Sequence, residues 1–349
     1  MAINFTGATR NHEEMEAVVQ EIYSNAGTFR DAIVNIDENH KSGTDVYESA
    51  VAVTMTALNT GEVTATGNVA LNVNRTPVSL VSYNYEDRIN DNSLKGTKFE
   101  KSMKAGAFNV VSDEFDKKVL IQVAPAIGAD LEAKLWNGAT AATKTAVAAL
   151  TPGAGQGSIT AAAQAAVAAM PTTLFDSFAT RILYNDSQSK TVPGAGLGNY
   201  IKVTGTTITS ANIAAEYGKL YAGAPEKVIN PTNEIGEVFI YAPLGHRQLI
   251  KVANNSVGAA QQVNFLVEGA GATEKIYYNG IEIKFVPLGA SFMVLAPSQF
   301  LTLLMDLVGD ISTLMIDQVA NGAMQRYIKN VGSIATWVTN QRYITLYGG

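Results

Sequence analysis

The chain has 349 residues and a formal charge of −6, so it lacks the basic footprint of a sequence-specific DNA-binding protein. It contains no cysteine, which excludes disulfides, thiol catalysis and cysteine-ligated metal centres. Charged residues make up only 16% of the chain, against about 25% in an average soluble domain, and we infer that partners cover much of the surface.

The first part of the chain alternates between a short helix and long extended segments. Residues 11–25 place apolar side chains on one face and predict a short helix that must lie against something else. Residues 29–47 are rich in polar turns and are typical of an extended arm. Residues 50–81 alternate with a strand period around a turn near Asn59 and Gly61, which predicts a long two-stranded ribbon. Because a lone ribbon is marginal in water, we expect it to pair with another chain or to lie across one.

Residues 86–104 form the most charged part of the chain. The charged residues are Glu86, Asp87, Arg88, Asp91, Lys95, Lys98, Glu100, Lys101 and Lys104. We favour a solvated return limb of the ribbon. The alternative is a zone of ion pairs between subunits, in which each exposed pair contributes little.

A long helix is predicted over residues 112–138, where apolar side chains recur at every fourth position. These are Phe115, Val119, Val123, Ile127, Leu131 and Leu135. They form one stripe, so the helix should pack along its whole length. Ser112 can cap its start, and Asn137 with Gly138 supplies a left-handed stop. At about 1.5 Å per residue such a helix is roughly 35–40 Å long.

Pro125 and Gly128 interrupt this helix. Proline removes the hydrogen bond to the carbonyl of Ile121, and a glycine follows within one turn. We expect either a bend at this point or two shorter helices placed end to end.

The second half of the chain mixes helices with strands, after a low-complexity stretch at residues 139–169 that is rich in Ala, Gly and Thr. Helices are expected at residues 158–170, 174–183, 243–254 and 297–307, and in a segment capped by Thr209. A glycine loop is expected at 192–198. Strands are expected at 200–208, 238–241, 277–283, 292–295, 314–316, 324–328, 334–338 and 343–346. Within 277–283, Asn279 and Gly280 are typical of a type I′ hairpin turn. Separate runs of helices and antiparallel strands indicate an α+β fold.

No constellation typical of catalysis, a metal or a cofactor is present in the sequence. The three histidines, His12, His40 and His246, have no second histidine at ligand spacing, and we interpret them as surface or capping residues. The glycine loop at 193–198 lacks the Lys-Ser/Thr of a phosphate-binding loop. The tyrosines between residues 217 and 278 come without interleaved arginines, which favours packing over nucleic-acid stacking. We therefore predict no enzyme activity, no cofactor and no metal ion, although carboxylates brought together only by folding remain an alternative.

The order of these parts resembles the major capsid proteins of tailed bacteriophages, which have the HK97-type fold. The resemblance covers the whole chain and rests on element order: residues 237–243 before a short helix, residues 279–287, residues 292–297, and a closing block of strands at 310–347 that contains Gly332. The resemblance implies an N-terminal arm at 1–49 and an E-loop at 50–104. A peripheral domain follows at 105–197 and contains the spine helix at 112–138 and an Ala/Gly-rich insertion. The axial domain would cover 198–295, and residues 296–349 would supply further strands of the peripheral domain and a C-terminal axial strand.

The resemblance implies a structural protein whose copies form pentamers and hexamers. These would close an icosahedral or prolate shell around phage DNA, which the protein would contact without sequence specificity. Portal, scaffold or cement proteins are further partners, with a separate scaffold, or none, favoured over a fused one. The shell would be made in the cytoplasm of a bacterial host, and neither a signal peptide nor a membrane-spanning run is visible.

Six residues are the candidate assembly residues. The family bends its spine helix before the capsid expands, so Pro125 and Gly128 would set that bend. Arg88 belongs to the charged segment at 86–104. Some members cross-link their shells through a lysine and an asparagine of neighbouring subunits, and Lys95, Lys98 and Lys101, with Lys104 after them, lie where such a donor is expected, without an identifiable acceptor. Two other classes stay open. One is an encapsulin-type nanocompartment, whose inward-facing helix would be residues 11–25, and the other is an enzyme whose site is assembled only by folding.

Overall fold

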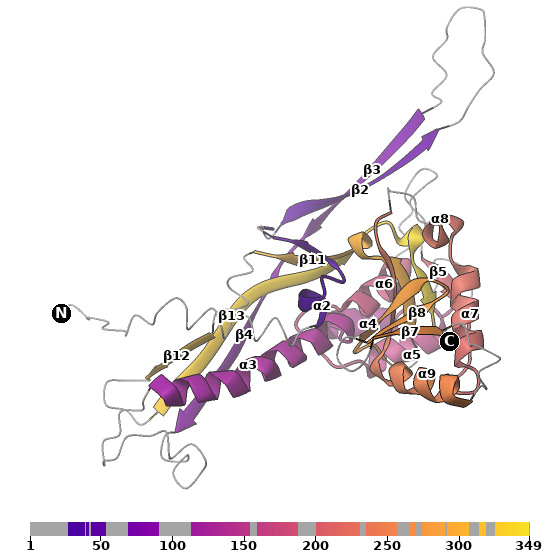
Figure 1. The fold of residues 1–349 in the computed structure, drawn as a ribbon. Helices are drawn as coiled ribbons and strands as arrows, with labels where there is room; N and C mark the ends of the chain where they lie inside the picture. The colour runs from indigo at the N-terminus through magenta and orange to yellow at the C-terminus, as the bar shows by residue number, and fades with distance from the viewer. Residues whose placement is uncertain are drawn as a thin grey trace, which may run out of the picture.

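The computed structural model places two sheets, one long helix and a projecting ribbon (Figure 1). The residues that it describes are 27–38, 40–41, 43–53, 69–90, 113–153, 159–187, 200–230, 235–256, 265–269, 274–289, 292–306, 314–318 and 325–348. The predicted helix at 11–25, the turn near Asn59, the Ser112 cap, the glycine loop at 192–198 and the lysines at 95, 98, 101 and 104 lie outside these residues.

A seven-stranded sheet is the largest sheet in the described part of the chain. Its strands run in the order β5 (Ile201–Val203), β14 (Thr345–Tyr347), β10 (Met293–Pro297), β6 (Val238–Pro243), β9 (Ile281–Val286), β8 (Lys275–Tyr278) and β7 (Phe265–Glu268). The pairs β6–β9 and β5–β14 are parallel, so the sheet is mixed. The helices α7 (Ile213–Gly223) and α9 (Leu244–Ser256) pack in the apolar cluster on one face, and the short helix α8 (Glu226–Ile229) follows α7.

The central strand β6 is buried on both faces. Ile240 and Ala242 face the cluster with α7 and α9, whereas Phe239 and Tyr241 face the cluster that contains the long helix. Successive side chains of a strand point to opposite faces, which explains why this short segment is a continuous apolar run.

A five-stranded sheet extends from this core. It is built on β13 (Gln325–Val338), which pairs with β12 (Leu314–Gln318) and β11 (Leu301–Met305), and with β4 (Val81–Asn90) over ten residues. The short strand β1 (Asn35–Asp37) lies parallel to β11 at the edge. In Figure 1 the spine-like helix α3 (Asp113–Trp136) runs alongside β13 and β4. None of the helices in the described part of the chain has the length and apolarity needed to cross a membrane.

The long helix is continuous through Pro125, so the alternative of two helices placed end to end is wrong. Among its described side chains, Ala124, Ile127, Leu131, Leu135 and Trp136 are buried. The Tyr85 hydroxyl on β4 donates a hydrogen bond of 2.5 Å to Asp130, which ties the five-stranded sheet to the exposed side of the helix. A bend at Pro125 stays a prediction.

The alanine-rich stretch forms two helices with a repeated sequence. In α4 (Ala141–Ala148) and α5 (Ala161–Ala169) a preceding threonine caps the first turn, through Thr140 and Thr160. Lys144 of α4 donates to the carbonyl of Met170 at the end of α5, and Gln164 of α5 donates to the carbonyl of Val147 at 2.8 Å. Because the two residues occupy equivalent positions twenty residues apart, each helix caps the other. Helix α6 (Phe178–Ser187) follows and packs in the same core.

Several predicted elements are confirmed, among them β6, β10 and the hairpin turn, where Asn279 and Gly280 have φ angles of 47° and 85°. The helix predicted at 297–307 is wrong. A single 3-10 turn, η4 (Ser298–Phe300), leads into strand β11, whose five residues are all buried between β1 and β13. A short apolar run does not distinguish a buried strand from a helix by its period.

The boundaries of several predicted elements also need correction. Of the strand predicted at 200–208, only residues 201–203 form a strand. The next helix starts at Ile213, and its N-cap position is occupied by Asn212 and not by Thr209. The strands predicted at 324–328 and 334–338 are one strand, and the last predicted strand is divided between η5 (Gln341–Tyr343) and β14. Residues 86–90 belong to β4, so this part of the supposed solvated limb is paired in a sheet, although residues 86–88 are exposed as expected.

Gly332 is the residue that lets β13 continue unbroken beneath Tyr83. The two residues are cross-strand partners, and a Cβ at position 332 would lie 2.7 Å from the Tyr83 hydroxyl oxygen. We expect Gly332→Ala to lower the free energy of unfolding by about 1–3 kcal/mol, because the buried ring must shift. Urea denaturation measures the effect. Val331→Ala, at the neighbouring 43% exposed position, is the control, and equal losses in the two variants would contradict this account.

Candidate assembly surface

The most prominent feature of the surface is a two-stranded ribbon. Strands β2 (Thr44–Val53) and β3 (Val69–Val78) form an antiparallel pair over ten residues. Figure 1 shows the ribbon projecting well beyond the two sheets. Among the described strands neither joins another sheet, so both outer edges offer backbone N–H and C=O groups. The predicted ribbon is confirmed, and its strands start and end earlier than residues 50–81.

The root of the ribbon is fixed to the five-stranded sheet by a small apolar cluster. Val78 at the end of β3 packs with Leu304, Ala335 and Trp337, and the half-buried Val46 and Leu80 cover them. This cluster is separate from the two larger cores. The ribbon is therefore held at its base and extends away from the fold as an arm.

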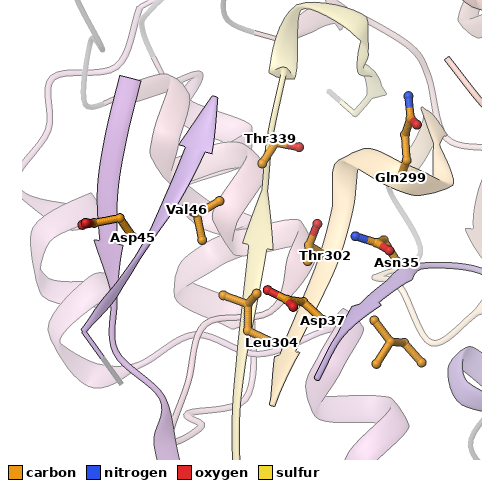
Figure 2. A pocket seen from close by; sticks show the side chains of 9 residues that line it. Asn35, Asp37, Asp45, Val46, Gln299, Thr302, Leu304 and Thr339 are labelled. Atoms are coloured by element: carbon orange, nitrogen blue, oxygen red, sulfur yellow. The ribbon is translucent and has the colours of Figure 1, made fainter. Parts of the chain in front are cut away.

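A hollow of about 430 Å³ opens beside this root (Figure 2). It is lined by residues of β1, β2, η4 and β11 and by the residue that follows β13, namely Asn35, Ile36, Asp37, Asp45, Val46, Gln299, Thr302, Leu304 and Thr339. Asn35 pairs with Thr302 and Asp37 with Leu304 across the parallel strands, which places these four side chains on one face of the sheet.

The segment before β1 is anchored to both cores. Helix α2 (Gly27–Arg30) carries Thr28, whose N–H and hydroxyl donate to Glu132 on α3 at 3.1 and 2.7 Å. The Trp136 indole N–H donates to the Thr28 hydroxyl at 2.7 Å, and the Tyr241 hydroxyl donates to the carbonyl of Ile33 at 2.5 Å. Burial raises the pKa of Glu132, and the hydrogen bonds from Thr28 only partly offset this effect. Whatever precedes residue 27 therefore leaves the fold from a fixed point.

The C-terminal strand is held by a buried hub around Glu216. This side chain, on α7, accepts hydrogen bonds from the hydroxyls of Tyr347 at 2.5 Å and Thr206 at 2.9 Å, and from Lys219 at 2.9 Å. Gly205 is required beside it, because a Cβ there would lie 1.8 Å from the Tyr347 ring. Burial by itself raises the pKa of Glu216, but the three hydrogen-bond donors outweigh burial and lower it to about 2.

This hub gives the fold a defined acid sensitivity. Because the pKa of Glu216 is lower in the folded state than in the unfolded chain, its contribution is complete above about pH 4.5 and is lost as the pH falls towards 2. We expect about 2 kcal/mol of the free energy of unfolding to disappear over this range, and Glu216→Gln to show a smaller fall. Urea denaturation at pH 7, 4 and 2.5 measures both. Glu226→Gln, on the exposed helix α8, is the control, and an identical pH dependence in all three proteins would contradict the assignment.

The structure places three of the six candidate assembly residues. Pro125 lies half-buried inside α3, and Gly128 is buried one turn later. Arg88 is exposed on β4, opposite Tyr327. Lys95, Lys98 and Lys101 lie outside the described residues, so their role stays a prediction.

The two described histidines, His40 and His246, are buried. His40 and His246 are 5% and 4% exposed, so the interpretation of them as surface residues is wrong. His246 lies 3.2 Å from the Tyr217 hydroxyl within an aromatic cluster that includes Tyr278 and Phe265, which confirms that these tyrosines are packing residues. Within the described residues there is no group of three or more His, Asp or Glu side chains that could hold a metal ion.

Sequence reasoning did not find the hollow or the anchored segment. Asn35, Asp37, Thr302 and Thr339 come from strands that are distant in the chain, and no local spacing links them. The mutual capping of α4 and α5 did have a signal, since the eleven residues that begin at Thr140 and at Thr160 follow the same pattern.

Comparison with known proteins agrees with this architecture. No family model matches the sequence, and no curated protein matches it. The capsid of a native GTA particle is similar in structure, with a TM-score of 0.50 at 11% identity, over 100% of this chain and 94% of that chain. Two further structures, a satellite phage P4 procapsid that includes the Sid protein and the holo-SrpI encapsulin complex from Synechococcus elongatus PCC 7942, have TM-scores of 0.47 and 0.46 at 9% and 8% identity. They cover 95% and 99% of this chain, and the matches span 98% and 91% of the respective chains.

The fold is therefore that of the shell-forming proteins with HK97-type architecture, an α+β arrangement with a projecting ribbon, a long helix and two sheets. The full-length overlap with the GTA capsid leaves no large part of this chain as an added domain. The boundaries of the N-terminal arm, E-loop, peripheral domain and axial domain stay predictions.

Proposed function

We propose that this protein is the major capsid protein of a tailed bacteriophage, whose copies assemble into pentamers and hexamers and close a shell around the genomic DNA. The observation that carries the proposal is the full-length structural similarity to the capsid of a GTA particle. The projecting ribbon supports it, because two strands with open edges and no sheet partner among the described strands require a neighbouring chain to bury them.

The composition agrees with a protein that is mostly covered by copies of itself. Only 16% of the residues are charged, and a net charge of −6 suits weak, sequence-independent contact with packaged DNA. A closed shell needs head-to-tail contacts that return on themselves, which a ring of five or six subunits provides. In this proposal portal, scaffold and cement proteins are further partners, and assembly takes place in the cytoplasm of the host bacterium.

An encapsulin-type nanocompartment is the second candidate, because the fold is shared. The two functions differ in what the shell contains, since a phage shell holds a genome and a nanocompartment holds a protein cargo. An enzyme is the third and least supported class, and the described residues offer no group of three or more His, Asp or Glu side chains that could hold a catalytic metal ion.

Negative-stain electron microscopy and mass photometry of the protein expressed alone test the proposal. Closed particles tens of nanometres across, or discrete pentamers and hexamers, are the expected result. Nuclease-protected DNA inside particles from a phage-producing culture separates the phage from the nanocompartment, in which a protein would be found instead. A uniform monomer or dimer at micromolar concentration, with and without co-expressed scaffold candidates, would overturn the proposal.

Pro125 offers a test of how the shell changes shape. Alanine at this position restores the hydrogen bond to the Ile121 carbonyl and removes a helix-interior proline, which typically costs about 3 kcal/mol. We expect Pro125→Ala to form precursor shells that expand more readily than wild type, because a straight helix is favoured from the start. Cryo-electron microscopy of shells before and after expansion measures this, with Ala126→Ser as the control. Wild-type geometry and expansion in Pro125→Ala would contradict the role of Pro125.

A further inference from the structure

The tip of the hairpin between β8 and β9 has the chemistry of a spontaneous modification site. Asn279 and Gly280 form this two-residue turn between the paired residues Tyr278 and Ile281. Both turn residues are exposed, with φ angles of 47° and 85°. The backbone nitrogen that follows an asparagine can attack the carbonyl carbon of its side chain. A glycine at the second position favours this attack, because it has no Cβ to hinder the approach.

The space around this turn is open. Among the described residues, no atom lies within 4 Å of the position that a Cβ on Gly280 would occupy. Ring closure requires rotation about the backbone of Asn279, and the open surroundings allow that rotation without displacing a neighbour. Exposed tips of this kind are also the places where a folded chain opens at low cost.

The chain contains the same two residue types in a closed setting. Asn137 and Gly138 follow the last turn of α3, and Gly138 is buried. The carbonyl of Gly138 accepts hydrogen bonds from the N–H of Ser177 at 2.9 Å and from the hydroxyl of Thr180 at 2.8 Å. A Cβ on Gly138 would lie 2.5 Å from the side chain of Thr173. Rotation of this peptide would therefore break two hydrogen bonds and push against a neighbouring side chain.

The structure thus separates two places that have the same sequence motif. A third pair, Asn321 and Gly322, lies outside the described residues. Of the two described pairs, only the one at the hairpin tip combines exposure with room to rotate.

We propose that Asn279 is a site of spontaneous deamidation, which converts it into a mixture of aspartate and isoaspartate. The nitrogen of Gly280 bonds to the side-chain carbonyl carbon of Asn279, and the side-chain nitrogen leaves as ammonia with the proton of that N–H. Water then opens the resulting cyclic imide. Cleavage of the bond from the imide nitrogen to the side-chain carbon gives aspartate, and cleavage of its bond to the backbone carbonyl carbon gives isoaspartate. The proposal does not depend on the proposed function.

The two products affect the hairpin differently. Aspartate before glycine favours the same type I′ turn, so this product leaves the hairpin intact. Isoaspartate carries the chain through its side-chain carbon and adds one atom to the backbone of a turn that sets the register of β8 and β9. Tyr278 and Ile281, on either side of the turn, are 2% and 9% exposed, and the Tyr278 hydroxyl donates to the carbonyl of Ala214 on α7 at 3.3 Å. The strain of the isoaspartate form therefore falls on a core contact.

Peptide mapping of the full-length protein tests the proposal. Purified protein is incubated in mildly alkaline buffer made with ¹⁸O-enriched water, digested and analysed by mass spectrometry, and isoaspartate is counted with a protein isoaspartate methyltransferase. We expect ¹⁸O in the peptide that contains Asn279, and conversion at least about tenfold faster than at Asn137, because the closed site must first open locally. In urea-unfolded protein the two positions should convert at similar rates. Equal rates at Asn279 and Asn137 in the folded protein would overturn the proposal, and so would an unreacted Asn279 after an incubation in which the unfolded chain has converted.

Two variants with the same turn preference separate the reaction from its consequences. Asn279→Gly keeps a type I′ sequence but has no side-chain amide, so its peptide should take up no ¹⁸O at this position. Asn279→Asp starts with the charge of the product, because aspartate is ionised at neutral pH. Its Tm should match that of fresh wild type, whereas aged wild type should contain a less stable fraction that grows with its isoaspartate content. Isoaspartate formation in Asn279→Gly to the wild-type extent would place the reaction at another residue and contradict the assignment.

Discussion

Replacing residues 51–71 with Asn-Gly is expected to give a folded protein that forms no closed shells. Ala50 and Asn72 are directly paired, so a two-residue type I′ turn can join them without changing the register of the remaining ribbon. The described core residues of the three apolar clusters are all retained in this variant, and the free energy of unfolding should change by less than about 1 kcal/mol. Assembly should be lost, because three of the ten strand pairs and all residues between them are removed, which shortens the edges that a neighbour would cover.

Thermal unfolding and negative-stain microscopy of the same preparations measure the two effects. A companion variant, in which Asn-Gly replaces only residues 54–68, keeps all ten pairs of the ribbon. It separates the role of the strands from that of the tip, since it should assemble if the strands make the contact. Shells of normal size from the protein lacking 51–71 would show that the ribbon is not an assembly element, and the proposed function would then lack its main structural support.

Trp136→Ala is expected to cause the largest loss of stability from a single substitution. The indole is 1% exposed, and its ring lies 4.9 Å from that of Tyr241 and 5.1 Å from that of Phe178. Truncation leaves a cavity between α3, α6 and β6 and removes the donor to Thr28, so about 3–5 kcal/mol should be lost. This is a large share of the stability of an ordinary domain.

Trp136→Phe separates the two parts of this effect. It keeps most of the aromatic volume but removes the hydrogen bond to Thr28, so it should cost about 1–2 kcal/mol. Urea denaturation gives both values, and limited proteolysis should show faster cleavage before β1 in both variants, because Thr28 holds α2 to α3. Losses below about 1 kcal/mol in Trp136→Ala would mean that the two sheets are held together elsewhere.

The elements that could be predicted from the sequence are those with strong local signals. The stripe from Ile127 to Leu135 predicted the buried part of α3, and Asn279 with Gly280 predicted a turn whose positive φ angles the structure contains. Strand β11 could not be predicted, because a five-residue run in which all but Thr302 are apolar has no clear period, and only β1 and β13 make it a strand. The same reason explains why two strands were predicted where β13 is one, since its continuity at Gly332 depends on pairing with β4.

The candidate site was predictable only in outline. The ribbon was visible as an alternating pattern without an obvious partner, and the lysine-rich segment as a run of charge. The hollow was not visible, because its floor is made when strands almost 270 residues apart, β1 and β11, come into register. Burial of His40 and His246 was missed for a related reason, since a polar residue is buried by partners that only the fold supplies.

The mutual capping of α4 and α5 makes their connection a promising place to carry foreign sequences. The N–H of Gly153 donates to the carbonyl of Ile159 at 2.9 Å, so the two ends of the connection are already held together. The helices on either side are fastened by Lys144 and Gln164 and do not depend on the length of the loop, and lengthening a closed loop costs little entropy. A guest peptide spliced between these ends would be repeated once per subunit, which would turn the particle into a multivalent display scaffold.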